Sequence, residues 1–509
     1  MGLCSAFDDF YCILQNSTEY IFYYVQVYIN IDLHTRVRFS STSIQITMND
    51  KQHNANSAEE HSVFYAATQA LRRHASGGNI LIAATLCALV IANIPGLNNY
   101  YFDFWQNEIR LQLGDFNIFS HSGEPMDLIA FINDALMAIF FFSIGLEIKR
   151  EILVGELSSF KQALLPIVAA IGGMLLPVGI YFCFAKGTDF ADGAAIPMAT
   201  DIAFSLGVLT MLGKRVPVSL KIFLTTLAVV DDIGGIVVIA SFYSTHIELT
   251  YLLYAAGLFV LLLLGSLMRI KSKIFYLGVG GVIWFLFLNS GIHPTIAGVL
   301  VAFCVPATPV FAPRKYIKMI RSAIAHFRGE DDDLLVKRTI LNKDQMNWLK
   351  QIESASDKVI SPLQELEDSL HPIVNYFIVP LFAFANAGIF LLDTDPSTIV
   401  EGVSLSIICG LVLGKFLGIF IFSWIAVKLR LAPMPDKTNW VMMASTAMLG
   451  GIGFTVSLFI ATLSFGSPGM TEILNHAKLG IVIGSLLSGI IGFILLHHTL
   501  PHYTPSQEE

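Results

Sequence analysis

The stretch LKIFLTTLAVVDDIGGIVVIASFY, residues 220–243, places two adjacent carboxylates, Asp231 and Asp232, in the middle of an apolar run of membrane-spanning length. About 20 apolar residues cross a hydrocarbon core, and each Asp near its centre costs roughly 2.5 to 3.5 kcal/mol on insertion scales. Neighbouring helix residues point about 100° apart, so at least one acid must face a polar cavity. Two acids this close disfavour ionising together, so we expect them to hold protons when empty and to release them to a cation. This is the chemistry of ion-for-proton exchange.

The composition of the whole chain is that of a polytopic membrane protein. Of its 509 residues, 54% are hydrophobic and 14% are charged, and the mean hydropathy is +0.64, which is too apolar for a soluble protein of this size. The net charge of -8 says little about partners, because charge is sorted by membrane side and by long loops, and it gives no reason to expect nucleic acid. The cysteines show neither a disulfide framework nor a metal motif, and no cofactor is expected.

Apolar runs of spanning length predict an all-α fold of about twelve transmembrane helices within residues 77–498. The runs are residues 77–96, 127–147, 162–185, 194–212, 217–243, 250–270, 274–290, 291–311, 372–392, 401–428, 439–465 and 476–498. Lys and Arg gather in the loops on the side shared by the N-terminus, and Asp and Glu dominate the opposite loops. Both termini are therefore predicted to be cytoplasmic.

Two of these runs are interrupted, and the interruptions predict broken helices. The fourth run contains AAIPMATDIAFSLG, in which Pro197, Thr200 and Asp201 break the apolar pattern. The eleventh contains MLGGIGFTVS, whose three glycines each weaken a helix by roughly 1 kcal/mol, although close-packing glycines explain this run equally well when it is taken alone. Free backbone groups at such breaks must line a cavity or pack in protein. Interrupted spans in corresponding places of two halves are typical of a transporter binding site.

Other charged residues lie inside or beside the predicted spans. Lys415, in CGLVLGKFLGIF, is too far from either end of its run to reach water easily, so a carboxylate partner is expected, Asp231 or Asp232. Asp134, in FINDALMAIFFF, is a further buried acid whose role the spacing does not settle. His293, in SGIHPTIAG, is predicted to be a hydrogen-bonded structural residue.

A charged cluster follows the second run, where GLEIKREI places Glu147 and Glu151 four residues apart with Lys149 and Arg150 between them. Residue spacing alone favours an ordinary charged helix end for this cluster. Without the resemblance described below, it predicts no specific role for Glu147 or Arg150.

Four segments lie outside or between the predicted spans. Residues 1–76 are predicted to be an N-terminal extension without a signal peptide, disordered at least in part, with Met48 as a candidate start. NEIRLQLGDFNIFS, 107–120, predicts an extracytoplasmic β-hairpin that pairs with another chain or packs on its own protein. Residues 312–370 predict a cytoplasmic loop insertion with amphipathic helices, and 499–509 a cytoplasmic tail.

Together these residues resemble the NhaA family of sodium/proton antiporters. The motifs INDALMAIFF, GLEIKRE, AAIPMATDIAFSLG, LAVVDDIGG, PLFAFANAG, LGKFLG and GGIGFTVSLFIATLSFG occur in family order between about Ser76 and His498. The resemblance implies electrogenic, pH-regulated exchange of protons for Na+ or Li+ by alternating access, in a bacterial inner membrane. It also implies an inverted repeat that relates spans three to five to spans ten to twelve.

The resemblance also implies roles for single residues. Asp232 would be the principal and transient Na+ ligand, and Asp231 the proton-carrying acid that pairs with Lys415. Thr200 and Asp201 would lie where the two broken helices cross. Glu147 and Arg150 would belong to a cytoplasmic pH-sensing cluster, and the hairpin 107–120 would hold a homodimer together in the lipid membrane.

The sequence departs from the family pattern in three places. Phe416 follows Lys415 where a proline is common, which changes the surroundings of the lysine but not its charge. The insertion 312–370 is longer than in compact members, and residues 1–47 match no part of the pattern.

Two other functions would use the same buried acids. A passive cation or proton channel needs acids in its pore, but it does not need a lysine to discharge one of them. An intramembrane aspartyl protease needs two acids that face each other, whereas these two are adjacent on one helix, and the spans contain no GxGD, HExxH or GxSG motif. We therefore expect a transporter and not an enzyme.

Overall fold

The computed structural model describes eleven stretches of the chain, all of them beyond the first 76 residues. They are residues 77–110, 112–113, 116–117, 120–121, 124–244, 247–308, 313–328, 343–357, 359–390, 402–467 and 469–500. The predicted extension 1–76, including Met48, and nearly all of the predicted tail 499–509 lie outside the described residues.

Within the described ranges, seven helical segments are long and apolar enough to cross a membrane, or up to nine if each of two bent pairs is one span. The seven are Leu128–Val154, Phe160–Ala185, Ala191–Met211, Val218–Phe242, Leu249–Leu267, Gly402–Lys428 and Thr471–Thr499. The bent pairs are α3 (Gly77–Asn93) with α4 (Asn98–Trp105), at 116°, and α20 (Trp440–Leu449) with α21 (Phe454–Phe465), at 43°. The chain is therefore a helical, polytopic membrane protein, and a total of twelve spans stays a prediction.

Several spans combine helices of different pitch. The first joins α5 (Leu128–Phe131), the π-helix η1 (Ile132–Leu136) and α6 (Met137–Val154), and another joins α18 (Gly402–Cys409), the π-helix η7 (Gly410–Gly414) and α19 (Lys415–Lys428). The 3-10 helix η3 (Ala191–Met198) precedes α8 (Ile202–Met211). The continuous spans are α7 (Phe160–Ala185), α9 (Val218–Phe242), α10 (Leu249–Leu267) and α22 (Thr471–Thr499). Short turns of 3-10 helix are η2 (Glu156–Ser158) and η4 (Gly213–Arg215).

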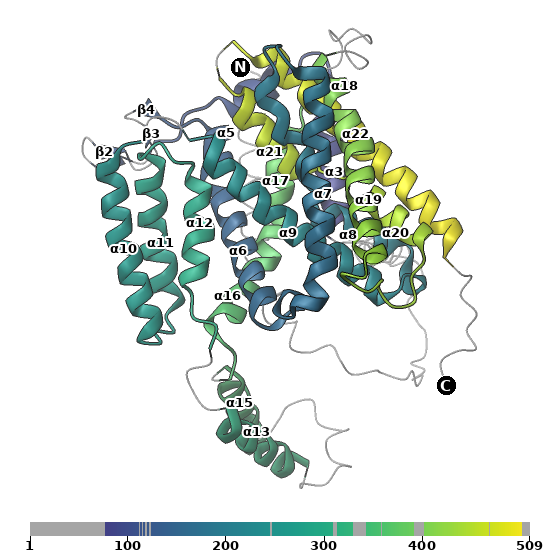
Figure 1. The fold of residues 1–509 in the computed structure, drawn as a ribbon. Coiled ribbons are helices and arrows are strands. Elements are labelled where there is room, and N and C mark those ends of the chain that lie inside the picture. The colour runs from purple at the N-terminus through teal and green to yellow at the C-terminus, as the bar shows by residue number, and fades with distance from the viewer. Residues whose placement is uncertain are drawn as a thin grey trace, which may run out of the picture. The chain divides into compact units, whose positions relative to one another are not determined.

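Helix α7 forms the centre of one group of helices, because it contacts α9, α19, α18 and η3 (Figure 1). Helix α22 packs against α18, α20 and α21 in the same group. In a second group, α12 (Pro294–Cys304) packs on α6, and α11 (Lys273–Leu288) lies between α10 and α12 (Figure 1). Helix α9 contacts α6 as well as α7, so it links the two groups.

Glycines let α7 and α19 approach each other closely. A Cβ atom added to Gly172 would collide with the backbone oxygen of Gly418, and one added to Gly418 would collide with the backbone oxygen of Gly172. The neighbouring Gly173 faces the side chains of Ile419 and Lys415. This contact between backbones fixes where Lys415, the first residue of α19, enters the group of helices.

Two predicted boundaries are wrong. The eighth run was expected to continue to residue 311, but α12 ends at Cys304, where the Lys149 amino group donates hydrogen bonds to the carbonyls of Phe303 (2.7 Å) and Val305 (2.5 Å) and so caps the helix end.

The ninth run was expected to begin at residue 372, but one helix is continuous through α16 (Pro362–Ile373), the π-helix η5 (Val374–Ile378) and α17 (Val379–Asn386). Its start is fixed by a capping box between Ser361 and Gln364 and by Pro362 in the first turn. The predicted loop insertion 312–370 therefore ends in a helix that leads into the membrane. Within the insertion, the structure describes α13 (Pro313–Arg328) and α15 (Lys343–Asp357).

The described strands are four pieces of two residues each. They are β1 (Gln112–Leu113), β2 (Phe116–Asn117), β3 (Ser120–His121) and β4 (Glu124–Pro125), and they pair antiparallel as β1 with β2 and β3 with β4. A single hairpin over 107–120 stays a prediction.

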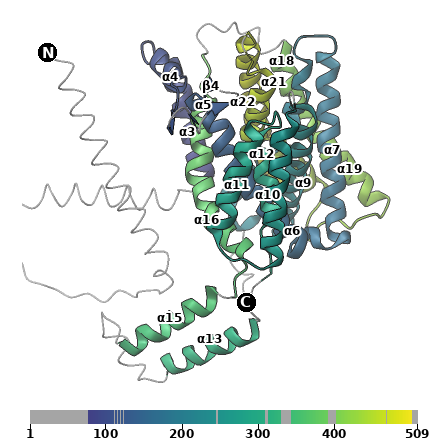
Figure 2. The same cartoon turned by 90° about the vertical axis from the view of Figure 1, so that its left-hand side faces the viewer.

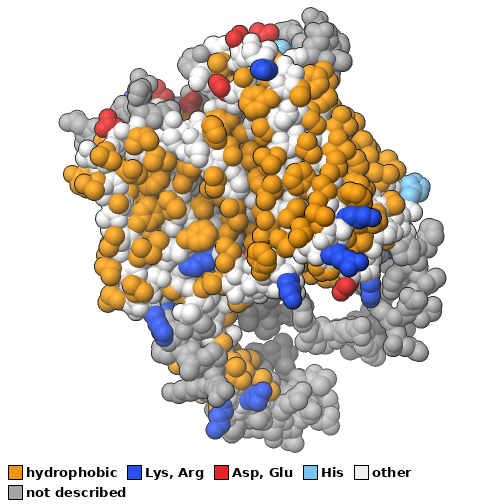
Figure 3. All heavy atoms as spheres, in the orientation of Figure 1, with side chains coloured by type: hydrophobic (Ala, Val, Ile, Leu, Met, Phe, Trp, Pro, Cys, Tyr) orange, Lys and Arg blue, Asp and Glu red, His pale blue; other side chains and the backbone are white. Residues whose placement is uncertain are grey.

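The outer surface of the helices is apolar. Figure 3 shows hydrophobic side chains across the helical face, with most Lys and Arg towards one end of the helices and most Asp and Glu towards the other. This is the distribution expected of side chains that face lipid between two charged membrane surfaces.

Candidate functional site

Two breaks in the helices lie against each other and satisfy each other's backbone groups. The chain between η3 and α8 contacts the chain between α20 and α21: the Asp201 backbone N–H donates to the carbonyl of Ile452 (2.6 Å), and the Ser457 hydroxyl donates to the carbonyl of Ile196 (2.7 Å). The Ser205 hydroxyl donates to the carbonyl of Leu449 (3.1 Å). Broken helices are tolerated inside a membrane only when such partners exist, so the two breaks depend on each other.

The Asp201 carboxylate holds the starts of two helices together. One oxygen, Oδ1, accepts the backbone N–H of Phe204 at 3.0 Å and caps α8. The other, Oδ2, accepts the backbone N–H of Thr455 at 3.1 Å and its hydroxyl at 2.6 Å, in the first turn of α21. Because helix N-termini carry partial positive charge, this buried carboxylate compensates two of them.

Asp231 forms a closed, fully buried cluster with Lys415 and Thr200. The Lys415 amino group donates to Asp231 Oδ2 at 2.5 Å and to the Thr200 hydroxyl at 2.9 Å, and the lysine is 0% exposed. Thr200 has one hydroxyl hydrogen, which it donates either to Asp231 Oδ2 (2.7 Å) or to the carbonyl of Gly450 (2.9 Å). Asp231 Oδ1 is buried without a partner among the described residues. The structure thus places the lysine beside Asp231 and not beside Asp232.

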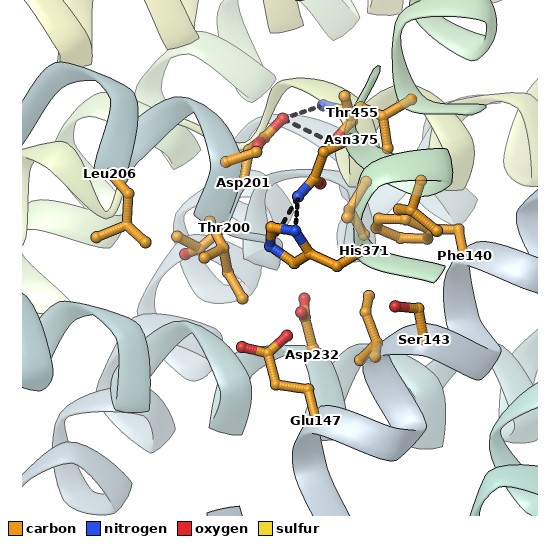
Figure 4. A pocket seen from close by; sticks show the side chains of 16 residues that line it. Phe140, Ser143, Glu147, Thr200, Asp201, Leu206, Asp232, His371, Asn375 and Thr455 are labelled. Carbon is orange, nitrogen blue, oxygen red and sulfur yellow. Dashed lines mark hydrogen bonds between the residues drawn. The ribbon is translucent and has the colours of Figure 1, made fainter. Parts of the chain in front are cut away.

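Asp232 faces a cavity of about 180 Å³ instead. Figure 4 shows its carboxylate opposite that of Glu147, with Thr200 and Asp201 on the same cavity wall. Asp232 accepts no hydrogen bond from the described residues, although only 5% of it is exposed. Oxygen atoms that no donor occupies are the ligands that hard cations prefer, so this carboxylate is available to a cation and to a proton.

The remaining lining of the cavity mixes apolar and polar side chains. It includes Phe140, Ser143, Leu206, His371, Asn375 and Thr455, and the Asn375 amide contacts the His371 ring at 2.9 Å (Figure 4). Among the residues that the structure describes, no three His, Cys, Asp or Glu side chains form a group that could hold a metal ion.

Arg150 connects the end of α6 to α16. Its guanidinium lies 3.0 Å from Glu367 and 3.0 Å from Glu151. Burial raises the pKa of the Glu367 carboxyl to about 7, while the charge of Arg150 lowers it and the nearby acids Glu147 and Asp368 raise it further. This carboxyl therefore titrates near neutral pH, on a helix whose residue His371 lines the cavity.

Asp134 and His293 form a separate polar contact. The ring nitrogen Nε2 of His293 lies 3.5 Å from Asp134 Oδ1, and its Nδ1 lies 2.8 Å from the Thr295 hydroxyl at the start of α12. The Trp284 ring N–H donates to the backbone carbonyl of Asp134 at 3.0 Å. His293 is hydrogen-bonded in a helix cap, as expected, and neither residue lines the cavity around Asp232.

Sequence reasoning missed three residues of this region, Thr455, Glu367 and His371. Glu367 lies in the stretch predicted to be helical within the loop insertion, and His371 lies between that insertion and the ninth run, so neither was expected near the site, although SPLQELEDSLHP carries a capping signal and leucines at helical spacing. Nothing in the sequence around Thr455 indicated a contact with Asp201, because only the crossing of the two helix breaks brings the two residues together.

The fold and this site define a class: a multi-pass membrane protein with buried acids and a buried lysine around two crossed helix breaks. Comparison with known proteins gives the family. The family model for Na+/H+ antiporter 1 matches residues 68–496.

Three of the most similar relatives are proteins named Na(+)/H(+) antiporter NhaA. One from Phocaeicola vulgatus is 53% identical over 444 residues, which are 87% of this chain and 98% of the relative. One from Bacteroides fragilis is 54% identical over 423 residues (83% and 95%), and one from Oleidesulfovibrio alaskensis is 43% identical over 434 residues (85% and 94%). The chain belongs to the Na+/H+ antiporter 1 family, as its motifs predict.

Proposed function

We propose that this chain is an electrogenic, pH-regulated antiporter that exchanges protons for Na+ or Li+ at Asp231 and Asp232. Its relatives bear the name of Na+/H+ antiporters and match over 98% and 95% of their own lengths, so the chain is a sodium/proton antiporter and not an enzyme. The observation that supports the site is the contrast within one dipeptide: Asp231 is paired with Lys415, while Asp232 faces a cavity and accepts no hydrogen bond from the described residues.

In the proposed cycle, a cation entering the cavity takes the place of a proton on Asp232. A cation that leaves water must regain its oxygen ligands and a compensating charge, and an ionised carboxylate supplies both. The hydroxyl of Thr200 and the carboxylate of Asp201 lie on the same cavity wall and would complete the oxygen surroundings. Return of a proton to Asp232 then favours release of the cation.

Asp231 and Lys415 account for net charge movement in this proposal. If Asp231 also takes up a proton during the cycle, its attraction for Lys415 weakens and the cluster around Thr200 can rearrange. Transfer of more than one proton against one monovalent ion moves charge across the membrane. A site with a single titrating acid would exchange the two ions without net charge.

Alternating access is proposed to use the crossed breaks. The broken spans fit an inverted repeat of spans three to five with ten to twelve, in which short helices can tilt without breaking a continuous helix. Glu147 and Arg150, together with Glu367, are proposed to sense pH at the entrance, since Glu367 titrates near pH 7 beside Arg150.

The surroundings of the protein are proposed from charge and sequence. The gathering of Lys and Arg at one end (Figure 3) supports both termini in the cytoplasm of a bacterium, with the spans in the inner membrane. The predicted hairpin 107–120 is proposed to join two copies as a homodimer. Lipid and the transported ions Na+, Li+ and H+ are the only other partners proposed.

Sodium-driven proton flux in proteoliposomes tests this function. The protein is reconstituted, a sodium gradient is applied across a pH series, and internal pH and membrane potential are followed with two dyes. We expect proton movement that requires Na+ or Li+, reverses with the gradient and generates a potential. Proton flux without sodium, or sodium flux without protons, would instead indicate the channel alternative.

A further inference from the structure

The helical hairpin of α13 and α15 has an asymmetric charge that the transport site does not explain. The two helices contact each other (Figure 2). Helix α13, PRKYIKMIRSAIAHFR, contains five Lys and Arg residues and no Asp or Glu, whereas α15, KDQMNWLKQIESASD, contains two basic and three acidic residues. The cationic charge of the hairpin is therefore concentrated on one helix.

The exposed face of α13 is both apolar and cationic. Ala323 is buried, while Ile317 and Ile324 are 43% and 44% exposed, and Lys318 and Arg321 are exposed beside them. Residues 317, 321 and 324 are spaced i, i+4 and i+7, so they share one face of the helix. Figure 3 shows hydrophobic and basic side chains next to each other on this hairpin.

Short connections hold the hairpin near the membrane. Helix α12 ends at Cys304 and α13 begins at Pro313, while α15 ends at Asp357 and α16 begins at Pro362. At roughly 3.6 Å per extended residue, the connections 305–312 and 358–361 reach at most about 29 Å and 14 Å. The lipid surface around the protein's own helices is thus always within reach of α13.

We propose that the strip of Ile317, Lys318, Arg321 and Ile324 docks on anionic phospholipid headgroups of the membrane in which the protein is embedded. Isoleucines on a cationic amphipathic helix enter the boundary between headgroups and acyl chains, and the long basic side chains keep their charges at the phosphates. Each basic residue near an anionic surface adds to the attraction, and a tether removes most of the entropy cost of association. In the orientation proposed above, this surface is the cytoplasmic leaflet. This inference does not depend on the transport mechanism.

One competing occupant lies in the chain itself. The residues GEDDD, 329–333, follow α13 directly in the sequence and carry four acids. They would offer α13 an anionic partner in any lipid. Protection of α13 that changes with the charge of the lipid therefore distinguishes docking on lipid from binding of these residues.

Hydrogen exchange of the full-length protein in nanodiscs tests the proposal. Two nanodisc compositions are compared: phosphatidylcholine alone, and phosphatidylcholine with about one third phosphatidylglycerol. We expect amides 317–324 to exchange roughly tenfold more slowly with phosphatidylglycerol, and this protection to fall in 0.5 M KCl, because salt screens the attraction between the basic side chains and the anionic headgroups. Lys318→Gln with Arg321→Gln should abolish the difference between the lipids.

A matched control removes the same charge from the other helix. Lys343 and Lys350 are exposed on α15, so Lys343→Gln with Lys350→Gln should leave the lipid dependence of α13 intact. Equal protection in both lipids would overturn the proposal and indicate the acidic run 329–333 as the occupant. If both double variants lost the lipid dependence of the protection equally, the proposal would also be overturned. The attraction to the membrane would then depend on the total charge of the hairpin and not on the α13 strip.

Discussion

The two adjacent acids of α9 lie on different sides of the helix and have different surroundings. On the closed side, Asp231 is bonded to Lys415 and Thr200, and 1% of it is exposed. On the open side, its neighbour Asp232 faces the cavity and accepts no hydrogen bond from the described residues. A buried carboxylate held by an ion pair and a hydrogen bond contributes to stability, whereas one without partners is available to a ligand. We therefore expect substitutions on the closed side to affect folding and those on the open side to affect transport.

The largest effect is expected on the open side. Asp232→Asn should lower sodium-driven proton flux by at least about 100-fold, because an amide cannot compensate the charge of a dehydrated cation. It should leave the Tm in detergent unchanged, since no described hydrogen bond is lost. Proteoliposome flux and thermal unfolding of the same preparation measure both effects, and undiminished transport would remove Asp232 from the proposed site.

The closed side should lose stability when its pair is broken. Lys415→Ala leaves Asp231 buried without its cation, which costs about 3 to 5 kcal/mol and should lower the Tm clearly. The double variant Lys415→Met with Asp231→Asn removes both charges, so it should recover much of this loss while transport stays low. Should the single and double variants unfold at the same temperature, Lys415 and Asp231 are not energetically coupled.

Glu367 extends the comparison to the contact between α6 and α16. Its pKa, raised from 4.5 to about 7, means that the folded protein holds this proton more tightly than the unfolded chain. The contribution to the free energy of unfolding is thus present below pH 4.5 and is lost as the pH rises to about 7, by roughly 2 to 3 kcal/mol for a side chain that is 16% exposed. Glu367→Gln should flatten the pH dependence of the Tm in this window.

Glu365 provides the charge-matched control on the same helix. Its carboxylate is 44% exposed and lies 2.8 Å from Lys273. Glu365→Gln should keep the wild-type pH dependence, because an exposed ion pair contributes little. If both variants flatten the profile, the effect belongs to the net charge of α16 and not to the buried carboxyl.

The smallest effect concerns Asp201, which belongs to both sides because it lines the cavity and bonds to two helices. Thr455→Val removes one of the hydrogen bonds to its carboxylate but keeps the shape and the backbone N–H, so we expect a loss of about 1.5 kcal/mol and a modest fall in flux. Ser445→Ala is the control, since that hydroxyl bonds only within its own helix, to Val441. Equal losses in both variants would assign the effect to helix packing.

Much of the fold was predictable because a membrane span requires an apolar run of about 20 residues, which can be seen in the sequence. The same logic predicted that Lys415 needs an acid and that two runs are interrupted. It could not choose between Asp231 and Asp232, since adjacent residues differ by a rotation about the axis of α9, and that rotation depends on how α9 packs against α7, α8 and α6. It predicted helix in residues 344–370 as part of a loop insertion, but it did not predict that the helix from Pro362 continues into the membrane. The role of each acid stays a prediction.

The contact between Gly172 and Gly418 has a mechanical consequence. Because backbone atoms fill the contact at Gly172 and Gly418, we expect a shift of one helix along the other to cause a collision, so α7 and α19 should move as one rigid body. Because Lys415 is the first residue of α19, the backbone of the lysine would move with that rigid body. A motion that opens and closes the cavity would then have to take place where these two helices together meet their neighbours, because the contact at Gly172 and Gly418 leaves no room for one helix to slide along the other.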